Sequence, residues 1–214
     1  MLTLRPDLER LQLLCVGAHS DDIEIGCGGA VLELLQRYPG SEVTWVVLCG
    51  LGAREQEARK SARSLLRAAK RADVRVAKFP DGYFPSQYAQ IKEFFESLKS
   101  APRPDVIFTH YRDDLHQDHR VASELTWNTF RDHLILEYEI VKYDGGLGSP
   151  NVFVPVSPAN VRRKVSHLMR HFGTQRAKRW FTEDTFRAML RIRGIECNSP
   201  SGHAEAFYVR KVVL

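Results

Sequence analysis

The chain has 214 residues, with 31 Lys and Arg against 26 Asp and Glu, and 43% of its residues are hydrophobic. This length fits one domain, and the composition is close to the globular average, which excludes a collagen-like, coiled-coil or disordered chain. No apolar run approaches the roughly 20 residues that a membrane-spanning helix needs. We therefore expect a single globular domain, residues 1–214, without a membrane span.

The N-terminus and the cysteines indicate a cytoplasmic protein. Charged residues interrupt the apolar ones near the N-terminus, which is not typical of a secretory signal: Arg5, Asp7, Glu9 and Arg10. The four cysteines have neither CxxC nor zinc-finger spacing: Cys15, Cys27, Cys49 and Cys197. We expect them to be buried, reduced thiols.

Short apolar runs alternate with helical patterns over the first 132 residues. The runs that predict strands are residues 11–16, 42–48, 74–79 and 105–109. The segments that predict helices are residues 28–38, 55–72, 88–99 and 122–132. This alternation predicts an α/β fold, a Rossmann-like three-layer sandwich with a mostly parallel central sheet and helices on both faces.

The pattern loosens after residue 134. Residues 142–158 are rich in Gly and Pro, which predicts a loop with at most a short strand at 152–156. Further on we expect helices at 159–170 and 185–193, and a closing strand at 204–213.

Basic residues concentrate in two segments. Residues 54–78 contain nine basic and three acidic residues, and residues 161–180 contain seven basic residues and no acidic one. Such runs are usually solvated helix faces, and the alternative is a surface that attracts anionic ligands. The chain lacks a recognisable nucleic-acid module and aromatics interleaved with the charges, so we expect no nucleic-acid partner.

Two segments rich in His and Asp follow strands of the predicted sheet. Residues 17–24 leave the first strand and residues 110–119 leave the fourth. Because the carboxyl ends of parallel strands share one edge of a sheet, the two segments should converge there. His and Asp suit zinc or a similar metal, and a hydrolytic site needs three such ligands and an open position for water. The alternative is that these are polar surface residues, helix caps and turns.

The glycines at 26, 28 and 29 follow the first of these segments. They do not form GxGxxG, and the acidic loop before them would repel a pyrophosphate, so we expect no dinucleotide site. They are better explained by close packing of the first helix against the sheet.

Both His- and Asp-rich segments resemble motifs of the LmbE/PIG-L family of zinc-dependent N-deacetylases. Residues 18–29, AHSDDIEIGCGG, are similar to the family's AHPDD motif with its following acid and glycine pair. Residues 114–119, DLHQDH, are similar to its HPDH motif. Ser20 and Gln117 stand where the family has proline, which removes some φ restraint. The resemblance covers residues 11 to about 132, and residues 204–207 are also family-like.

The resemblance implies a role for each residue that matches the two motifs. One zinc ion per chain, with Fe²⁺ as the other candidate, would have three ligands: His19, Asp22 and His119. Asp21 would be the general base that deprotonates the attacking water. His116, oriented by Asp118, would stabilise the oxyanion or protonate the leaving amine.

Candidate substrate-binding residues lie outside the motifs. Arg54 matches a polar position that lines the family pocket, and Tyr143 and Asp144 in the Gly-rich loop could contact a sugar. His203, just before the last strand, could also reach the site. Glu24 is expected to be structural, and the other histidines structural or exposed: His110, His133, His167 and His171.

The resemblance implies a hydrolase that removes an N-acyl, chiefly N-acetyl, group from a small amino sugar or its conjugate, giving acetate and a free amine. The implied substrate is of the N-acetylglucosamine type, alone or with a phosphate, nucleotide or lipid attached. The resemblance also leaves a homo-oligomer open. Two alternatives remain. A metal-dependent phosphoesterase would use two metal ions about 4 Å apart. A non-catalytic α/β domain would bind anionic partners through residues 162–179.

Overall fold

The computed structural model describes residues 7–213, and residues 1–6 and 214, among them Arg5 of the N-terminal argument, lie outside the described residues. Within that range seven strands form one sheet in the order β3-β2-β1-β4-β5-β7-β6. Five of them are parallel: β1 (Gln12–Gly17), β2 (Glu42–Val47), β3 (Arg71–Val76), β4 (Val106–His110) and β5 (Leu134–Tyr138). β7 (Ala204–Tyr208) is antiparallel to β5, and β6 (Val152–Pro155) is antiparallel to β7. The predicted mostly parallel sheet is confirmed.

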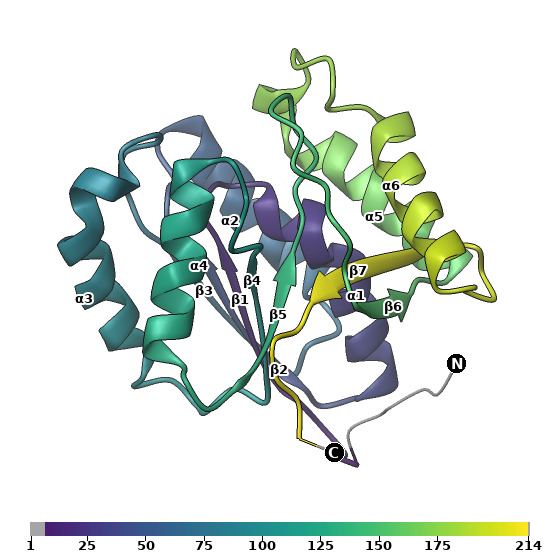
Figure 1. Ribbon diagram of the computed structural model, residues 1–214, viewed down its shortest axis with the longest axis horizontal. Coiled ribbons are helices and arrows are strands. Elements are labelled where there is room, and N and C mark those ends of the chain that lie inside the picture. Colours follow the sequence, from purple (N-terminus) through teal and green to yellow (C-terminus); the bar gives the residue numbers. More distant parts are fainter. Residues whose placement is uncertain (1–6, 214) are drawn as a thin grey trace.

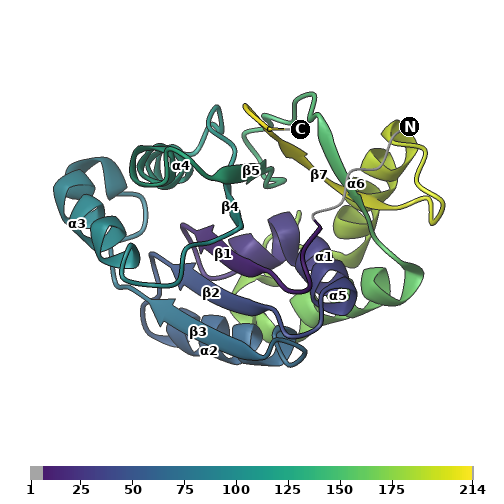
Figure 2. The same ribbon diagram turned by 90° about the horizontal axis from the view of Figure 1, so that it is seen from below.

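Helices cover both faces of the sheet (Figures 1 and 2). One face carries α3 (Tyr88–Leu98) and α4 (Gln117–Thr129), and the other carries α1 (Asp22–Arg37) and α2 (Ala53–Leu65). The last two helices, α5 (Pro158–His171) and α6 (Glu183–Glu196), lie on the same side of the sheet as α1 and α2. α5 packs on α1 and α2, and α6 packs on α5 and β7. Two short 3₁₀ turns complete the elements: Phe84–Gln87 and Gly173–Gln175.

Alternation along β1 shows how the sheet separates two cores. Leu13 and Cys15 belong to the cluster on the α1 and α2 side, whereas Leu14 and Val16 belong to the cluster on the α3 and α4 side. All four are at most 3% exposed, because a strand between two helical layers buries both of its faces.

Several element boundaries differ from the sequence-based expectation. Residues 134–138 form β5, a strand we did not predict, with four of its five residues buried between β4 and β7. The helix expected over 55–72 ends at Leu65, because residues 71–76 pair with β2 despite their helix-favouring composition. The closing strand ends at Tyr208 rather than at residue 213.

Two helices begin earlier than expected, and this matters for the site. Helix α1 begins at Asp22 rather than at residue 28, and α4 begins at Gln117 rather than at residue 122. Asp22 and His119 therefore lie in the first turns of helices, on regular helical backbone.

The glycines of α1 allow close packing, as predicted. A Cβ atom at Gly26 would lie 2.1 Å from Cδ2 of Tyr138 on β5, and one at Gly29 would lie 2.9 Å from Glu205 on β7. The Glu205 carboxylate accepts hydrogen bonds from the N–H groups of Gly29 and Ala30, at 2.8 and 2.6 Å, and pairs with Lys164. Lys164 is thus a buried partner of α1, in contrast to the solvated charge expected for its segment.

In the described part of the chain, every helix is too short or too polar to cross a bilayer. The four cysteines are unpaired, and three of them are buried while Cys197 is half-buried.

Candidate metal and catalytic site

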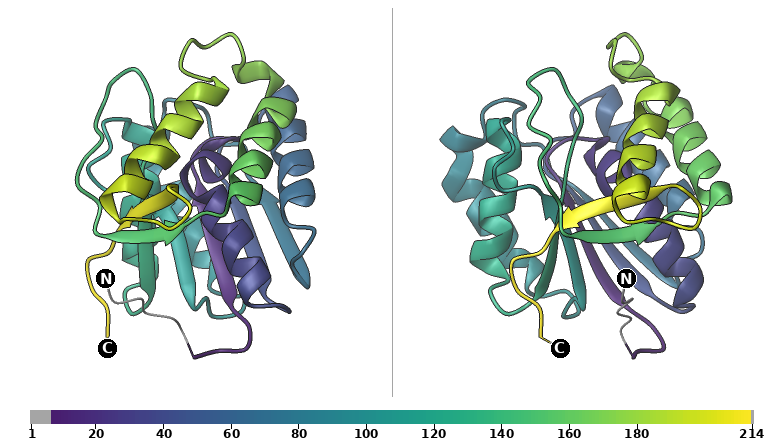
Figure 3. Two further views of the ribbon diagram at one scale, coloured as in Figure 1. Left: turned by 90° about the vertical axis from the view of Figure 1, so that its right-hand side faces the viewer. Right: turned by 45° about the vertical axis from the view of Figure 1, so that its right-hand side comes forward.

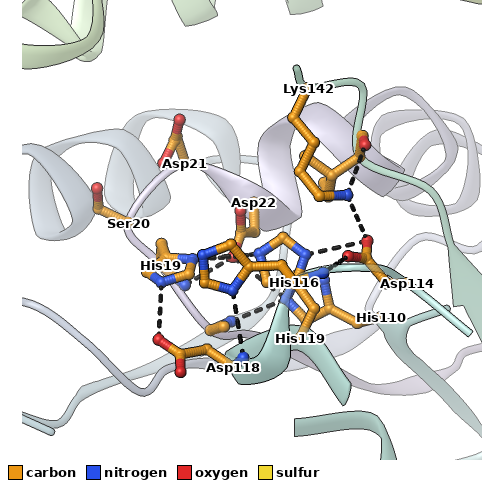
Figure 4. Close-up of polar contacts among 12 residues, drawn as sticks. His19, Ser20, Asp21, Asp22, His110, Asp114, His116, Asp118, His119 and Lys142 are labelled. Atoms are coloured by element: carbon orange, nitrogen blue, oxygen red, sulfur yellow. Dashed lines mark hydrogen bonds and ion pairs between the residues drawn. The ribbon is translucent and has the colours of Figure 1, made fainter. Parts of the chain in front are cut away.

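The two His- and Asp-rich segments follow β1 and β4 and lie together at the carboxyl ends of these strands, as expected for a parallel sheet (Figure 4). The loop after β1 contributes His19, and α1 directly after it contributes Asp22. His110 ends β4, and the segment after it contributes His116 and His119. The loop after β3 adds further acidic and backbone groups.

Three side chains converge in a way that suits a metal ion. His19 Nδ1 lies 3.2 Å from Asp22 Oδ2 and 3.2 Å from His119 Nε2, and the last two atoms are 3.6 Å apart. Ligand atoms about 2.0–2.1 Å from a tetrahedral ion lie about 3.3 Å from one another. The distances and the nitrogen and oxygen donors therefore fit one divalent ion held by these three residues.

The far side of each of these histidine rings contacts a carboxylate. His119 Nδ1 lies 3.1 Å from Asp114, which in turn pairs with Lys142 at 2.8 Å. His19 Nε2 lies 3.0 Å from Asp81 and 3.3 Å from Asp118. Outer carboxylates of this kind fix the tautomer and orientation of a ligating histidine.

Asp118 makes different contacts from those expected. Its carboxylate accepts hydrogen bonds from the N–H groups of Gly82 and Phe84, at 2.6 and 3.1 Å, and contacts His19 rather than His116. The link to His116 runs through the backbone, since the Asp118 N–H donates to His116 Nδ1 at 3.2 Å. His116 is the N-cap of α4. Because its Nδ1 accepts, the proton of the neutral ring is on Nε2.

Asp21 and Asp22 are adjacent but lie in different electrostatic environments. Burial and the charge of Asp22 raise the pKa of Asp21 to about 6, although Arg54, 3.8 Å away, opposes the rise. Burial would also raise the pKa of Asp22, but His119, His110 and His19 outweigh it and hold that pKa well below its usual range. Asp21 points away from the histidines in Figure 4. Of the two adjacent carboxylates, Asp22 is the one that contacts the histidine rings, whereas Asp21 lies near Arg54.

The histidines also differ from one another. Burial and the nearby His110 lower the pKa of His119 to about 3, and burial lowers the pKa of His116 as well. Burial opposes the charged form of His19, yet Asp22 and Asp118 raise its pKa well above the usual value. A metal ion bound at His19 Nδ1 would therefore have to displace a proton.

A cavity of about 300 Å³ opens above these groups. It is lined by Asp21, Asp22, His19, His116 and His119, by Arg54, Tyr143 and Asp144, and by Asp81, Ile140, Lys142, Lys178 and Trp180. Three of the four candidate substrate-binding residues thus line it. The fourth, His203, lies elsewhere, with its Nδ1 2.9 Å from the carbonyl oxygen of Ser201.

Sequence reasoning missed several residues of the site. His110 is fully buried, and its Nε2 accepts from the Ala18 N–H at 2.9 Å and lies 3.2 Å from Asp22. Asp81 follows β3, so the strand-end rule that selected the other segments could have found it. Lys142, Lys178 and Trp180 come from irregular segments that carry no comparable signal.

A family model described as PIG-L, GlcNAc-PI de-N-acetylase, matches residues 14–130, which include both motifs. Among solved structures, a conserved protein of Thermus thermophilus is 22% identical, with a TM-score of 0.72, over 95% of this chain and 96% of the other. An N,N'-diacetylchitobiose deacetylase of Pyrococcus horikoshii is 20% identical, with a TM-score of 0.73, over 95% and 84%.

A third similar structure has a different activity. GalB of Pseudomonas putida, a 4-carboxy-2-hydroxymuconate hydratase, is 15% identical, with a TM-score of 0.73, over 95% of this chain and 98% of the other. Structural similarity at these identities establishes the fold, and the reaction has to be argued from the residues of the site.

Proposed function

This chain belongs to the PIG-L family of GlcNAc-PI de-N-acetylases, and on that premise we propose that it hydrolyses the N-acetyl group of an amino-sugar-containing substrate, giving acetate and a free amine. The observation that carries the proposal is the convergence of His19, Asp22 and His119, with mutual distances of 3.2–3.6 Å, beside the buried Asp21 on an open cavity. The proposal extends to one domain over residues 1–214 and a cytoplasmic location, and it leaves a homo-oligomer open.

His19, Asp22 and His119 would hold one divalent ion per chain, Zn²⁺ or Fe²⁺. When bound, such an ion polarises an amide carbonyl and lowers the pKa of a water molecule. Asp114 and Asp118 would orient the two histidines through the ring nitrogens that face away from the ion.

Asp21 is the proposed general base. It takes one proton from the water whose oxygen forms the new bond to the acyl carbon. When the C–N bond breaks, the same carboxyl returns that proton to the nitrogen, so that a neutral amine and a carboxylic acid result. A pKa of about 6 suits both directions of transfer near neutral pH.

His116 is the proposed hydrogen-bond donor to the carbonyl oxygen. Its Nδ1 is occupied by the Asp118 N–H, and burial lowers its pKa, so the neutral ring offers an Nε2–H to the cavity. A preorganised donor of this kind stabilises negative charge as it develops on the oxygen. Asp118 then supports the reaction by positioning both His116 and His19.

Arg54, Tyr143 and Asp144 are the proposed contacts to the sugar. Arg54 pairs with Asp81 at 2.7 Å and lies close to Asp21, so it could present a fixed donor beside the reacting group. Tyr143 and Asp144 line the same cavity, and both are exposed residues. His203 has no place in this proposal, since its ring contacts the carbonyl of Ser201 outside the cavity.

One observation favours phosphoester hydrolysis as a second candidate. A second set of potential ligand atoms, from His19, Asp81, His116 and Asp118, lies with all its members within 4.8 Å of one another. Two neighbouring metal ions would be the arrangement of a phosphoesterase. The second set shares His19 with the first, and Arg54 already neutralises Asp81, which makes this the weaker candidate.

The test is an assay of chelated and metal-reloaded protein on N-acetylated amino sugars and on aryl phosphate esters. We expect free amine and acetate in equal amounts from the reloaded protein, and neither product from the chelated protein. Release of phosphate without release of amine would replace the deacetylase by the phosphoesterase. Turnover of neither substrate class with any divalent ion would contradict both.

A further inference from the structure

We propose that His110, the last residue of β4, is a positioning residue that holds the metal-binding side chains at their mutual distances before an ion binds. It does so by accepting a hydrogen bond from the N–H of Ala18, the residue directly before His19. The proposal rests on the metal site of the function proposed above, and it holds whichever reaction that site catalyses. It gives a role to a histidine that lies outside both sequence motifs.

His110 contacts both segments that supply metal ligands. It is fully buried and is not among the residues that line the cavity. Its Nε2 accepts from the Ala18 N–H at 2.9 Å and lies 3.2 Å from Asp22 Oδ2. Its ring stacks on the ring of His119, with centroids 3.9 Å apart and an angle of 21° between the planes (Figure 4). One side chain of β4 therefore joins the segment after β1 to the first turn of α4.

The hydrogen bonds of His110 argue against its being a ligand itself. Potential ligand atoms of Asp22, His110 and His119 lie within 4.8 Å of one another. A ligating nitrogen needs a free lone pair, however, and the Nε2 lone pair of His110 is directed at the Ala18 N–H. His19 and His119 also each contact a carboxylate through the ring nitrogen on the far side, as ligating histidines do. His110 Nδ1 has no hydrogen-bond partner in the described part of the chain.

That unpartnered nitrogen also argues against a role in packing alone. Because Nε2 accepts, a neutral His110 ring carries its proton on Nδ1. A buried N–H group without a partner opposes folding. An apolar side chain would fill the same space without this cost, so the acceptor at Nε2 is the feature that needs a histidine here.

The Ala18 N–H lies where the backbone pairing of the sheet has ended. The pairing of β1 with β4 ends at Cys15 and Phe108. The carbonyl groups of Gly17 and Ala18 still accept hydrogen bonds, from the two residues that follow β2. The Ala18 N–H instead bonds the side chain of His110. Ala18 is fully buried, so removal of this acceptor would leave a buried donor unsatisfied, and the backbone there would have to move.

Movement of Ala18 would disturb the metal ligands, because two of them follow it closely. The N–H of His19 donates to Asp22 Oδ2 at 2.6 Å, and the same oxygen lies 3.2 Å from His19 Nδ1. The position of the Ala18 backbone thus sets where both side chains begin. Residues that orient the ligands of a metal contribute to its affinity without touching it.

His110 belongs to the central sheet, whereas loops form much of the cavity wall. Figure 3 shows the loop after β5 and the segment before α6 rising beyond the carboxyl ends of the strands. β4 pairs with β1 on one side and with β5 on the other, and all five of its residues are buried. A positioning residue on such a strand is held more precisely than one on a loop.

The experiment measures the dissociation constant for Zn²⁺ on the metal-free full chain near neutral pH, by competition with a chromophoric chelator. His110→Phe keeps an aromatic ring but removes the acceptor, and we expect the affinity to fall about 10–100-fold. His110→Gln restores an acceptor, since its amide oxygen reaches about as far as Nε2, and the affinity should stay within about threefold of the wild type.

Thr109→Val is the matched control. Thr109 is the neighbouring residue of β4 and is equally buried, but its hydroxyl contacts the hydroxyl of Thr126 rather than the site. Its loss should leave the zinc affinity unchanged. Circular dichroism and thermal unfolding of the metal-free proteins report whether each variant is folded. If His110→Phe does not fold, His110→Asn gives the same test, because its shorter amide does not reach the Ala18 N–H.

Wild-type affinity in the folded His110→Phe or His110→Asn variant would overturn the assignment. An equal loss in Thr109→Val would also overturn it, since any disturbance of β4 would then suffice. A loss in His110→Gln as large as that in His110→Phe would place the effect in the ring stack and reject the acceptor. A wild type that binds zinc but hydrolyses no acetylated sugar would reject the deacetylase, whereas the affinities of the variants would still decide the role of His110.

Discussion

Two buried clusters of histidine and carboxyl groups lie at the start of α1, and they differ in what they can do. In the first, His19, Asp22 and His119 converge beneath a cavity. In the second, which we call the Ser61 cluster, the Ser61 hydroxyl donates to Glu24 and lies 2.8 Å from Nε2 of His167. Its members Glu24, Ser61 and His167 are 1%, 0% and 7% exposed, and none of them lines the cavity.

The comparison shows that burial of a carboxyl does not by itself identify a functional group. Burial raises the pKa of Asp21 to about 6 and the pKa of Glu24 to about 8, so a shifted pKa alone would select both carboxyls. Only Asp21 faces a space that a substrate can enter. The convergence of ligand atoms on an open cavity, rather than the perturbation of a titratable group, marks the candidate site.

The largest expected effect is the difference in kcat between a variant that lacks the Asp21 carboxyl and one that lacks the Glu24 carboxyl. Asp21→Asn removes the proposed base, and we expect kcat to fall about a thousandfold while the metal content stays the same. Glu24→Gln is the matched change at the other cluster, where the raised pKa already keeps the carboxyl neutral at pH 7. It should change kcat less than about threefold. Equal losses in the two variants would break the distinction between the clusters.

A smaller effect is expected from two glycines of α1, the helix that contributes Asp22 to the first cluster and Glu24 to the second. A Cβ at Gly26 would lie within 2.7 Å of three atoms of the buried Tyr138 ring, so we expect Gly26→Ala to lower the free energy of unfolding by about 1–3 kcal/mol. Gly28 has no such neighbour closer than 3.9 Å, and Gly28→Ala should raise stability by up to about 1 kcal/mol. Thermal and urea unfolding measure both. Equal effects would mean that α1 is not held against β5 by this contact.

The smallest effect concerns the pH dependence of stability. Burial, with His171 nearby, lowers the pKa of His167 to about 3, below its ordinary value of about 6.5. The unfolded chain therefore takes up a proton as the pH falls through 6.5, and the folded chain does not until about pH 3. The contribution of His167 to the free energy of unfolding is therefore present in full above pH 6.5 and is lost as the pH falls below 6.5.

His167→Gln should remove that loss. Between pH 7.5 and pH 5.5 the wild type should lose roughly 1.4 kcal/mol more than the variant, a difference of about 4 °C in Tm. Scanning calorimetry at the two pH values measures it. Identical pH dependence in the two proteins would show that His167 takes up its proton in the folded state.

The sequence predicted the parts of the fold and site that follow local rules. Alternating strands and helices predicted the parallel sheet, and strand ends rich in His and Asp predicted the region where His19, Asp22 and His119 meet. β5 was missed because its short run, LILEY, is recognisable only by its position between β4 and β7. The boundaries of α1 were missed because Gly-rich segments have a low helix propensity, and packing against Tyr138 outweighs it.

Contacts that depend on irregular segments could not be predicted. The Asp118 carboxylate accepts hydrogen bonds from the N–H groups of Gly82 and Phe84, because the loop after β3 packs against α4. A sequence motif around Asp118 carries no information about this distant loop. The same holds for Tyr143, which lines the cavity. Its hydroxyl accepts a hydrogen bond from the N–H of Arg179, which lies 36 residues further along the chain. His203 was expected to reach the site, but its side chain instead turns to Ser201.

The most direct test of the account is the metal content per chain, measured by elemental mass spectrometry on the wild type, His119→Ala and His167→Gln after reconstitution. We predict about one divalent ion per chain in the wild type and in His167→Gln, and none in His119→Ala, with circular dichroism showing that all three are folded. Equal metal content in the wild type and His119→Ala, or no metal in any of the three proteins, would contradict the assignment of the site.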